Sequence, residues 1–326
     1  MAGRGLGRAW GWRLMLGRKL GAHGPDISVI GYGAWEAGGE MWGGEVEDDR
    51  TRQAMETAIE RGVDWIDTAE AYGDGRSEEL VGEVIRRHRG EVRVFTKVAP
   101  FKSGLRPEQV KSAAEGSLKR LGVDHIDLFQ IHWPDTDGVP IEDTWGAMAR
   151  LQDEGLVGYL GVSNFHRELV ERCLAIRHVD SVQNQYSLLH REDEADLLPW
   201  LEQRGVGYLA YGPLAYGLLT GTITKETRFD PGDWRSGRWN LGYYDELFAP
   251  GKLEPNLEIV TTLTKVAERV DLPLPTLALR AALAVPGVTA AIAGSRNPRH
   301  ARMNAEAGDS ELDPEVVAEI RRILAA

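Results

Sequence analysis

Short runs of β-branched and aromatic residues alternate with longer segments of helical pattern along the chain from Val63 onward. The segment 107–121 is typical of the longer ones, because Val110, Ala113, Ala114 and Leu118 recur three or four positions apart with polar residues between them. Strand-like runs that alternate with helical segments indicate repeated β-α units, in which the strands lie parallel.

The pattern predicts eight strands, with a helix after each. The strands are predicted at residues 28–33, 64–69, 92–98, 125–132, 157–162, 181–186, 206–211 and 289–294. The helices are predicted at residues 49–61, 77–87, 107–121, 143–154, 167–176, 194–204, 257–270 and 298–307, with additional helices at 276–284 and 314–324. Right-handed crossovers repeated eight times close a barrel more readily than an open sheet, so we predict an α/β fold with a single (β/α)8 TIM barrel.

One long irregular segment, residues 220–255, follows the seventh predicted strand. It is rich in aromatic residues, namely Trp234, Trp239, Tyr243, Tyr244 and Phe248. A loop of this length is typically functional, so a lid over the site is one interpretation and a separately packed small core is the other.

A doubly wound dinucleotide-binding fold is disfavoured, because no predicted strand is followed by the glycine pattern G-x-G-x-x-G. The nearest match runs from Gly31 to Glu36, lacks the third glycine and does not open directly into a helix. A nicotinamide cofactor would therefore have to bind without that phosphate loop.

Composition excludes several classes of protein. The chain has 326 residues, a formal net charge of −12 and 42% hydrophobic residues, so we expect neither nucleic acid nor an anionic membrane as a partner. Cys173 is the only cysteine, which rules out an intrachain disulfide and cysteine-rich metal sites and fits a cytoplasmic protein. The histidines show no HExxH-like spacing, so we predict no metal.

Residues 1–15 are predicted to be an extension before the barrel domain, residues 16–326. Arg4, Arg8 and Arg13 occur there without any acidic residue, as in a basic tail or a transit peptide. The alternative is a start codon assigned too early, because Met15 directly precedes the expected domain.

Catalytic residues of such a barrel belong at the C-terminal ends of its strands. The second predicted strand ends at Asp67 and is followed by Tyr72, while Lys97 and His132 end the third and fourth. A phenol has a pKa of about 10, so its use as an acid near neutrality requires a nearby cation such as Lys97. Asp67 would orient that lysine, Tyr72 would donate a proton to a carbonyl oxygen, and His132 would help to hold the oxygen.

The stretch from Ile66 to Gly73, Ile-Asp-Thr-Ala-Glu-Ala-Tyr-Gly, resembles the signature of the aldo-keto reductase family. The resemblance extends over nearly the whole chain from about Leu16. It implies that Tyr72 is the general acid of carbonyl reduction, that Lys97 and Asp67 tune it, and that His132 positions the substrate.

The later strand ends resemble the same family and imply a bound NADPH. Ser163, Asn164 and Gln183 match residues that hold the nicotinamide carboxamide, and Tyr211 matches the aromatic ring that stacks on the nicotinamide. The other residues expected at the cofactor are Gly33, Pro213, Leu214, Gly217, Leu218, Gly294, Ser295, Arg296, His300 and Asn304.

Arg296 is predicted to set the preference for NADPH over NADH, because a guanidinium in the first turn of a helix suits a 2′-phosphate. The chain departs from the family pattern at His300, where a glutamine is usual, and at Met303, which replaces an acidic residue near the adenine. Asn304 is retained. These departures affect the expected adenine contacts and leave the catalytic set intact.

Trp35 and Trp133 are candidates for an apolar substrate slot, and the alternative for each is a place in the core. Two other functions also stay open. Lys97 would be the nucleophile of a Schiff-base aldolase if its amine were neutral. An NADPH-binding regulatory protein with little turnover is the other alternative. The sequence specifies neither the physiological carbonyl nor the oligomeric state.

Overall fold

A closed barrel of eight parallel strands forms the centre of the computed structural model, which describes residues 15–44, 47–238 and 245–325. The strands follow the order β10-β3-β4-β5-β6-β7-β8-β9 around the barrel, so neighbours in sequence are neighbours in space. Their bounds are β3 Ile30–Gly33, β4 Trp65–Asp67, β5 Arg93–Val98, β6 Ile126–Ile131, β7 Val157–Ser163, β8 Ser181–Gln185, β9 Gly207–Tyr211 and β10 Ala290–Ile292. The predicted single TIM barrel is confirmed.

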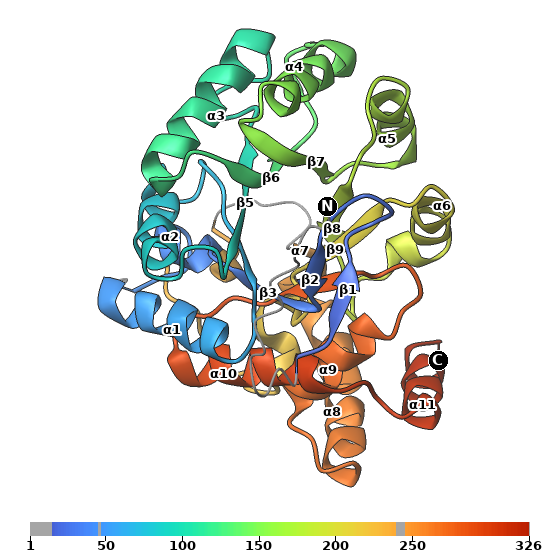
Figure 1. Ribbon diagram of the computed structural model, residues 1–326. Helices are drawn as coiled ribbons and strands as arrows, with labels where there is room; N and C mark the ends of the chain where they lie inside the picture. Colours follow the sequence, from blue (N-terminus) through green and yellow to red (C-terminus); the bar gives the residue numbers. More distant parts are fainter. Residues whose placement is uncertain (1–14, 45–46, 239–244, 326) are drawn as a thin grey trace, which may run out of the picture.

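Helices surround this barrel as an outer ring (Figure 1). Each presents an apolar face to the strands, as α2 does by burying Leu80, Val81, Val84 and Ile85. The helices of this ring are α1 Asp48–Glu60, α2 Arg76–Arg87, α3 Pro107–Leu121, α4 Ile141–Asp153, α5 Arg167–Leu174, α6 Leu197–Gln203, α9 Leu274–Leu283 and α10 Pro298–Glu306.

The first predicted strand, residues 28–33, is wrong as a single element. A two-stranded antiparallel hairpin, β1 Gly17–Lys19 and β2 Asp26–Ser28, precedes the barrel, and β3 begins only at Ile30. Leu20 and Ile27 of this hairpin pack with Trp65 and Phe95 in the barrel interior, so the hairpin closes one end of the barrel (Figure 1). Strands of three residues are too short to give a periodic signal.

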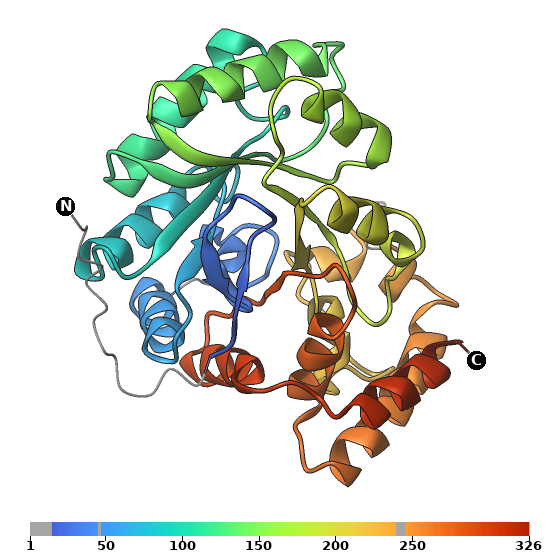
Figure 2. The same cartoon turned by 45° about the vertical axis from the view of Figure 1, so that its right-hand side comes forward.

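The prediction that residues 257–270 form the barrel helix and residues 276–284 an additional one is wrong. The helix that packs on the barrel before β10 is α9, and its Leu279, Ala282 and Leu283 belong to the main core. The longer α8, Leu253–Arg269, lies farther out against α11, Pro314–Ala325 (Figure 2). The reason is burial, because α9 is apolar around most of its circumference while α8 has an apolar stripe only.

The segment after β9 contains short helical turns, namely η3 Ala215–Thr220, η4 Trp234–Ser236 and α7 Asp245–Phe248. Trp234 is buried and its ring packs against those of Trp35, Trp42 and Phe248. The described part of the segment thus packs tightly and borders the barrel mouth. Trp239, Tyr243 and Tyr244 lie outside the described residues.

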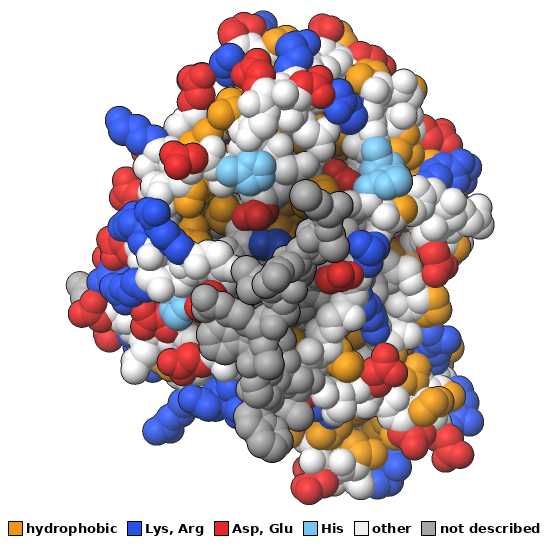
Figure 3. Space-filling model, in the orientation of Figure 1, with side chains coloured by type: hydrophobic (Ala, Val, Ile, Leu, Met, Phe, Trp, Pro, Cys, Tyr) orange, Lys and Arg blue, Asp and Glu red, His pale blue; other side chains and the backbone are white. Residues whose placement is uncertain are grey.

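Met15 is buried and contacts Gly308, while residues 1–14 lie outside the described part of the chain. The predicted extension thus stays a prediction. Acidic and basic side chains are interspersed over the face that Figure 3 shows. Among the described helices, none is both long and apolar enough to cross a membrane. Within the same residues, no group of three or more His, Cys, Asp or Glu side chains is arranged to hold a metal ion.

Candidate active site

Four polar side chains predicted from the sequence meet at one end of the barrel. Asp67 is the last residue of β4, Lys97 lies near the end of β5, and His132 directly follows β6. Tyr72 lies in the turn between β4 and α2. Parallel strands of a barrel end on the same side, so residues far apart in sequence come together here.

A buried ion pair forms the floor of this site. The Nζ atom of Lys97 donates to Oδ1 of Asp67 at 2.5 Å and to the carbonyl oxygen of Thr68 at 2.8 Å. The other carboxylate oxygen of Asp67 accepts from the side-chain amides of Gln183 at 2.8 Å and Gln130 at 3.3 Å. Burial lowers the pKa of Lys97, and the charge of Asp67 opposes that effect.

Tyr72 and His132 lie above the ion pair. Their Oη and Nε2 atoms are 3.5 Å apart, and Nζ of Lys97 is 5.2 Å from the centroid of the Tyr72 ring. Burial lowers the pKa of His132 well below its usual value, and the nearby Lys97 charge adds to the effect, so the imidazole is neutral at neutral pH. A phenol beside a cation and a neutral imidazole can together bind one carbonyl oxygen.

Aromatic side chains surround the same point. The ring of Trp35 lies 6.2 Å from that of Tyr72, and Trp133, next to His132, is half-buried. Phe101, which was not predicted from the sequence, is 67% exposed, and its ring centroid lies 5.9 Å from that of His132. An exposed ring beside a polar cluster can contact the apolar part of a ligand.

The loop that carries Phe101 is held by a buried carboxylate, that of Glu70, which was also not predicted from the sequence. Glu70 accepts from the backbone N–H of Ala99 at 2.9 Å and from the hydroxyl of Ser103 at 2.7 Å. Burial raises the pKa of Glu70, and these two hydrogen bonds oppose that effect. The only signal in the sequence is an acid within the motif that includes Asp67 and Tyr72.

The residues expected at the nicotinamide form one hydrogen-bonded group beside His132. Asn164 donates to the carbonyl oxygen of His132 at 2.9 Å and to the hydroxyl of Ser163 at 3.1 Å. The hydroxyl of Tyr211 donates to Oδ1 of Asn164 at 2.6 Å. Gln183 is bound to Asp67, as described above, so it links this group to the ion pair.

The segment that follows β9 turns sharply. Pro213 and Leu218 are buried and Leu214 half-buried, while Ala215, Tyr216 and Gly217 all have positive φ angles of 47°, 53° and 104°. These successive left-handed residues make a tight turn, in which the N–H groups of Ala215 and Gly217 donate to the carbonyl oxygens of Gly212 and Leu214. The pyrophosphate contact expected at this turn stays a prediction.

Two of the predicted glycines, Gly33 and Gly294, lie against each other. A Cβ atom on Gly294 would lie 2.1 Å from the carbonyl oxygen of Gly33, so β3 and the end of β10 approach too closely for side chains. Ser295 follows, and its carbonyl oxygen accepts from the hydroxyl of Tyr32 at 2.7 Å. Asn304, farther along α10, is buried.

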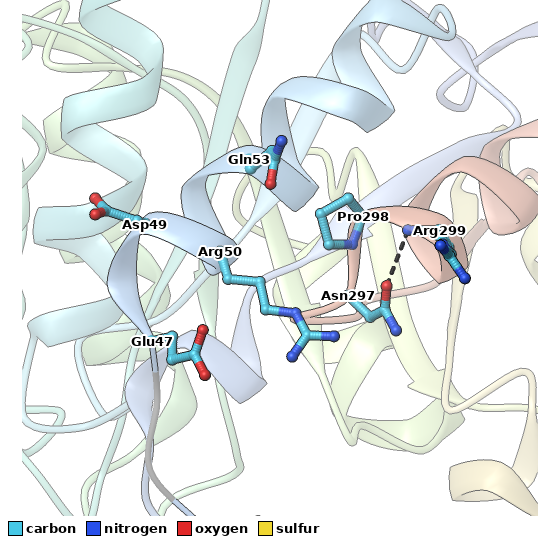
Figure 4. A pocket seen from close by; sticks show the side chains of 7 residues that line it. All are labelled: Glu47, Asp49, Arg50, Gln53, Asn297, Pro298 and Arg299. Atoms are coloured by element: carbon cyan, nitrogen blue, oxygen red, sulfur yellow. Dashed lines mark hydrogen bonds between the residues drawn. The ribbon is translucent and has the colours of Figure 1, made fainter.

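Arg296 and His300 line a cavity of about 280 Å³, together with Glu36, Glu47, Arg50, Ser295 and Asn297. The Nη1 atom of Arg296 is buried and has no hydrogen-bond partner among the described residues. The adjoining cavity lies between the start of α1, with Arg50, and the start of α10, with Arg299 (Figure 4). An orphaned guanidinium nitrogen and neighbouring cations at a helix N-terminus fit a phosphate group.

Comparison with known proteins identifies the family of the chain. The model of the aldo/keto reductase family matches residues 29–325. Aldo-keto reductase YhdN of Bacillus subtilis is 37% identical to the chain, with 92% of this chain and 91% of that protein covered. The NADH-specific methylglyoxal reductase of Escherichia coli is 28% identical, with 88% of this chain and 92% of that protein covered.

Solved structures give the same result. A glycerol dehydrogenase of Gluconobacter oxydans has a TM-score of 0.82 at 31% identity and covers 94% of each chain. An aldo-keto reductase of Klebsiella pneumoniae, solved in complex with NADPH, has a TM-score of 0.74 at 29% identity, with 94% of this chain and 95% of that chain covered. The family model spans most of the chain, and relatives match it in both sequence and structure. The chain therefore belongs to the aldo/keto reductase family.

Proposed function

We propose that this protein reduces an aldehyde or ketone to an alcohol with NADPH, with Tyr72 as the general acid. The proposal rests above all on the cluster of Tyr72 and His132, whose Oη and Nε2 atoms are 3.5 Å apart above the Lys97–Asp67 ion pair. Bound NADPH would supply the hydride that adds to the carbonyl carbon. The family assignment supports an oxidoreductase acting on a small molecule.

The residues of the chain account for the proton and for the charge that develops on oxygen. As the carbonyl carbon accepts hydride, the oxygen becomes an alkoxide, and Oη of Tyr72 gives it a proton. The phenolate left on Tyr72 is stabilised by the charge of Lys97 and takes its next proton from solvent. The neutral imidazole of His132 donates a hydrogen bond to the same oxygen and orients the substrate.

The cofactor fits the residues at the end of β10 and the segments before it. Ser163, Asn164 and Tyr211 would hold and stack the nicotinamide, the turn at Gly217 would bind the pyrophosphate, and Arg296 would bind the 2′-phosphate. The NADPH complex of the Klebsiella pneumoniae relative supports this form of the cofactor. The NADH-specific relative of Escherichia coli makes a test of both forms necessary.

A Schiff-base aldolase is a weaker proposal. Burial does lower the pKa of Lys97, as that reaction requires. However, its side chain has no exposed surface, and its Nζ atom is bound to Asp67 and Thr68. An amine so enclosed has no room to attack a carbonyl carbon.

A spectrophotometric screen distinguishes the remaining alternatives. Purified protein is mixed with NADPH or NADH and a panel of aliphatic, aromatic and sugar carbonyls, and the loss of reduced-nicotinamide absorbance is followed. Consumption that depends on carbonyl supports the reductase. Tight NADPH binding without turnover over the whole panel would instead favour a regulatory protein.

A further inference from the structure

A carboxylate occupies the cofactor cavity beside the arginine expected to bind phosphate. Glu36 belongs to the short helix η1, Trp35–Gly38, which directly follows β3. Its Oε2 atom lies 3.6 Å from Nε of Arg296 and accepts a hydrogen bond from the backbone N–H of the same residue at 3.4 Å. Glu36 thus contacts both the edge of the guanidinium and the backbone just before Asn297, the N-cap of α10.

The rest of Arg296 is also held by the chain. Its Nη2 atom donates to the carbonyl oxygens of Gly43 at 3.3 Å and Trp42 at 3.5 Å. Nη1 has no hydrogen-bond partner among the described residues, and the Nε atom makes the ion-pair contact with Glu36 at 3.6 Å. A bidentate contact with a phosphate uses Nη2 together with either Nη1 or Nε, so a 2′-phosphate has to displace the carbonyls from Nη2 and, when it uses Nε, also has to compete with Glu36.

The guanidinium groups of Arg296 and Arg235 both favour the charged form of the Glu36 carboxylate. Its side chain is 27% exposed, and Arg296, Arg235 and His300 all act on it electrostatically. Burial raises the pKa of Glu36, while these three neighbours oppose that effect. Glu47 and Arg50 line the same cavity on its α1 side.

We propose that Glu36 is a specificity-determining residue that competes with the 2′-phosphate for Arg296 and so narrows the preference for NADPH over NADH. This inference rests on the proposed cofactor site. A 2′-phosphate brings up to two negative charges close to the carboxylate, whereas the 2′-hydroxyl of NADH brings none and can donate a hydrogen bond to it. The carboxylate therefore disfavours one cofactor and tolerates the other.

The opposite role for Glu36 is that of a positioning residue, which holds Arg296 in the orientation that phosphate needs. The two roles predict effects of opposite sign. Removal of a competitor tightens NADPH binding, and removal of a positioning residue weakens it. The substitution Glu36→Gln keeps the size and an acceptor oxygen while it removes the charge, so it separates the two.

The test measures cofactor binding rather than turnover. Dissociation constants of NADPH and NADH are determined by quenching of tryptophan fluorescence for the wild type, for Glu36→Gln and for Glu47→Gln. The last variant is a matched control, because it removes the same charge from the exposed wall of the same cavity. We expect Glu36→Gln to lower the dissociation constant of NADPH by about tenfold and to change that of NADH by less than about twofold. Glu47→Gln should change the ratio of the two dissociation constants much less than Glu36→Gln does.

Three outcomes would overturn the inference: equal changes for both cofactors, no change for either, or weaker NADPH binding by Glu36→Gln. Turnover in the carbonyl screen together with any of these results means that the reductase proposal stands and only the inference fails. If Glu36→Gln binds NADPH more tightly but no carbonyl is turned over, the inference about Glu36 stands and the reductase proposal fails. The binding measurement thus separates the two proposals.

Discussion

The hydroxyl of Tyr72 and the imidazole of His132 face each other at the barrel mouth, with Oη and Nε2 3.5 Å apart and the two rings edge to face. The distance is slightly long for a direct hydrogen bond, so an acceptor atom placed beside the pair can take hydrogen bonds from both groups. Lys97 lies beneath, 5.2 Å from the phenol ring centroid. From this arrangement we predict the effect of replacing Tyr72, Lys97 or His132.

Replacement of Tyr72 by phenylalanine removes the proton donor and keeps the ring. We expect the turnover number for carbonyl reduction to fall by about 10²–10⁴-fold, the usual contribution of general acid catalysis. The dissociation constant of NADPH should hardly change, because the ring contact with Trp35 is retained. Steady-state kinetics and a fluorescence titration measure the two effects, and a variant with full turnover would rule out the acid role.

The Lys97–Asp67 pair should behave as a buried unit. Asp67→Asn leaves the Lys97 charge without its counter-ion in a fully buried place, so we expect the free energy of unfolding to fall by about 3–5 kcal/mol. The double variant Asp67→Asn/Lys97→Met removes both charges and should lose less stability than the two single variants added together. Urea unfolding of all four proteins gives the coupling, and simple additivity would contradict it.

Much of this fold could be predicted from the sequence, because barrel strands buried on both faces give continuous apolar runs. The grouping of Asp67, Lys97 and His132 at one barrel end could also be predicted, since each residue follows or ends a parallel strand. The hairpin at β1 and β2 escaped prediction because its strands have only three residues each. The predicted barrel helix at residues 257–270 was also wrong, because the pattern does not show which of two helices is buried, and α9 is the one buried against the barrel.

Contacts between distant loops could not be predicted. Glu36 and Arg296 are 260 positions apart, and nothing in either local pattern points to the other. Phe101 stood in an irregular loop, where exposure and direction depend on the hydrogen bonds that Glu70 makes. Tertiary packing determines such contacts, and strand and helix periodicity carries no information about it.

Stability should fall on acidification because of His132. Its folded-state pKa is lowered by burial, so between that value and the ordinary value of 6.5 the unfolded chain binds more protons than the folded one. The stabilising effect of the neutral imidazole is complete above pH 6.5 and is lost as the pH falls towards the folded-state pKa. One such group contributes at most about 1.4 kcal/mol per pH unit.

Urea unfolding of the wild type and of His132→Asn between about pH 5 and 7.5 tests this, over the range in which histidine titrates. The variant should lose less stability on acidification than the wild type. His178, whose pKa burial also lowers, contributes in the same direction, so His178→Asn serves as a comparison. Identical pH profiles for the wild type and His132→Asn would contradict the prediction.

Phe101 should affect the choice of substrate rather than the chemistry. Its ring is 67% exposed and lies 5.9 Å from that of His132, so it can pack on an aromatic ring of a bound carbonyl compound. Such ring pairs contribute about 0.5–1.5 kcal/mol, and Phe101→Ala should raise KM for aromatic aldehydes about two- to tenfold. KM for a short aliphatic aldehyde is the internal control, and an equal rise for both would contradict the contact.

Arg296 should set the affinity for the 2′-phosphate, and its effect should depend on Glu36. A hydrogen bond to a charged group contributes about 1.5–3 kcal/mol, so Arg296→Ala should raise the dissociation constant of NADPH roughly 10- to 150-fold and leave that of NADH nearly unchanged. The substitution also leaves the Glu36 carboxylate beside the phosphate without its partner.

The double variant Arg296→Ala/Glu36→Gln removes that repulsion and should therefore recover part of the NADPH affinity lost by Arg296→Ala. Because the two side chains are in contact, their effects should not be additive, and fluorescence titration of the wild type, both single variants and the double variant measures the coupling. If Arg296→Ala changes both cofactors equally, or neither, a different cation binds the phosphate. Arg50 and Arg299, on the two helices that border the adjoining cavity, are then the residues to replace (Figure 4).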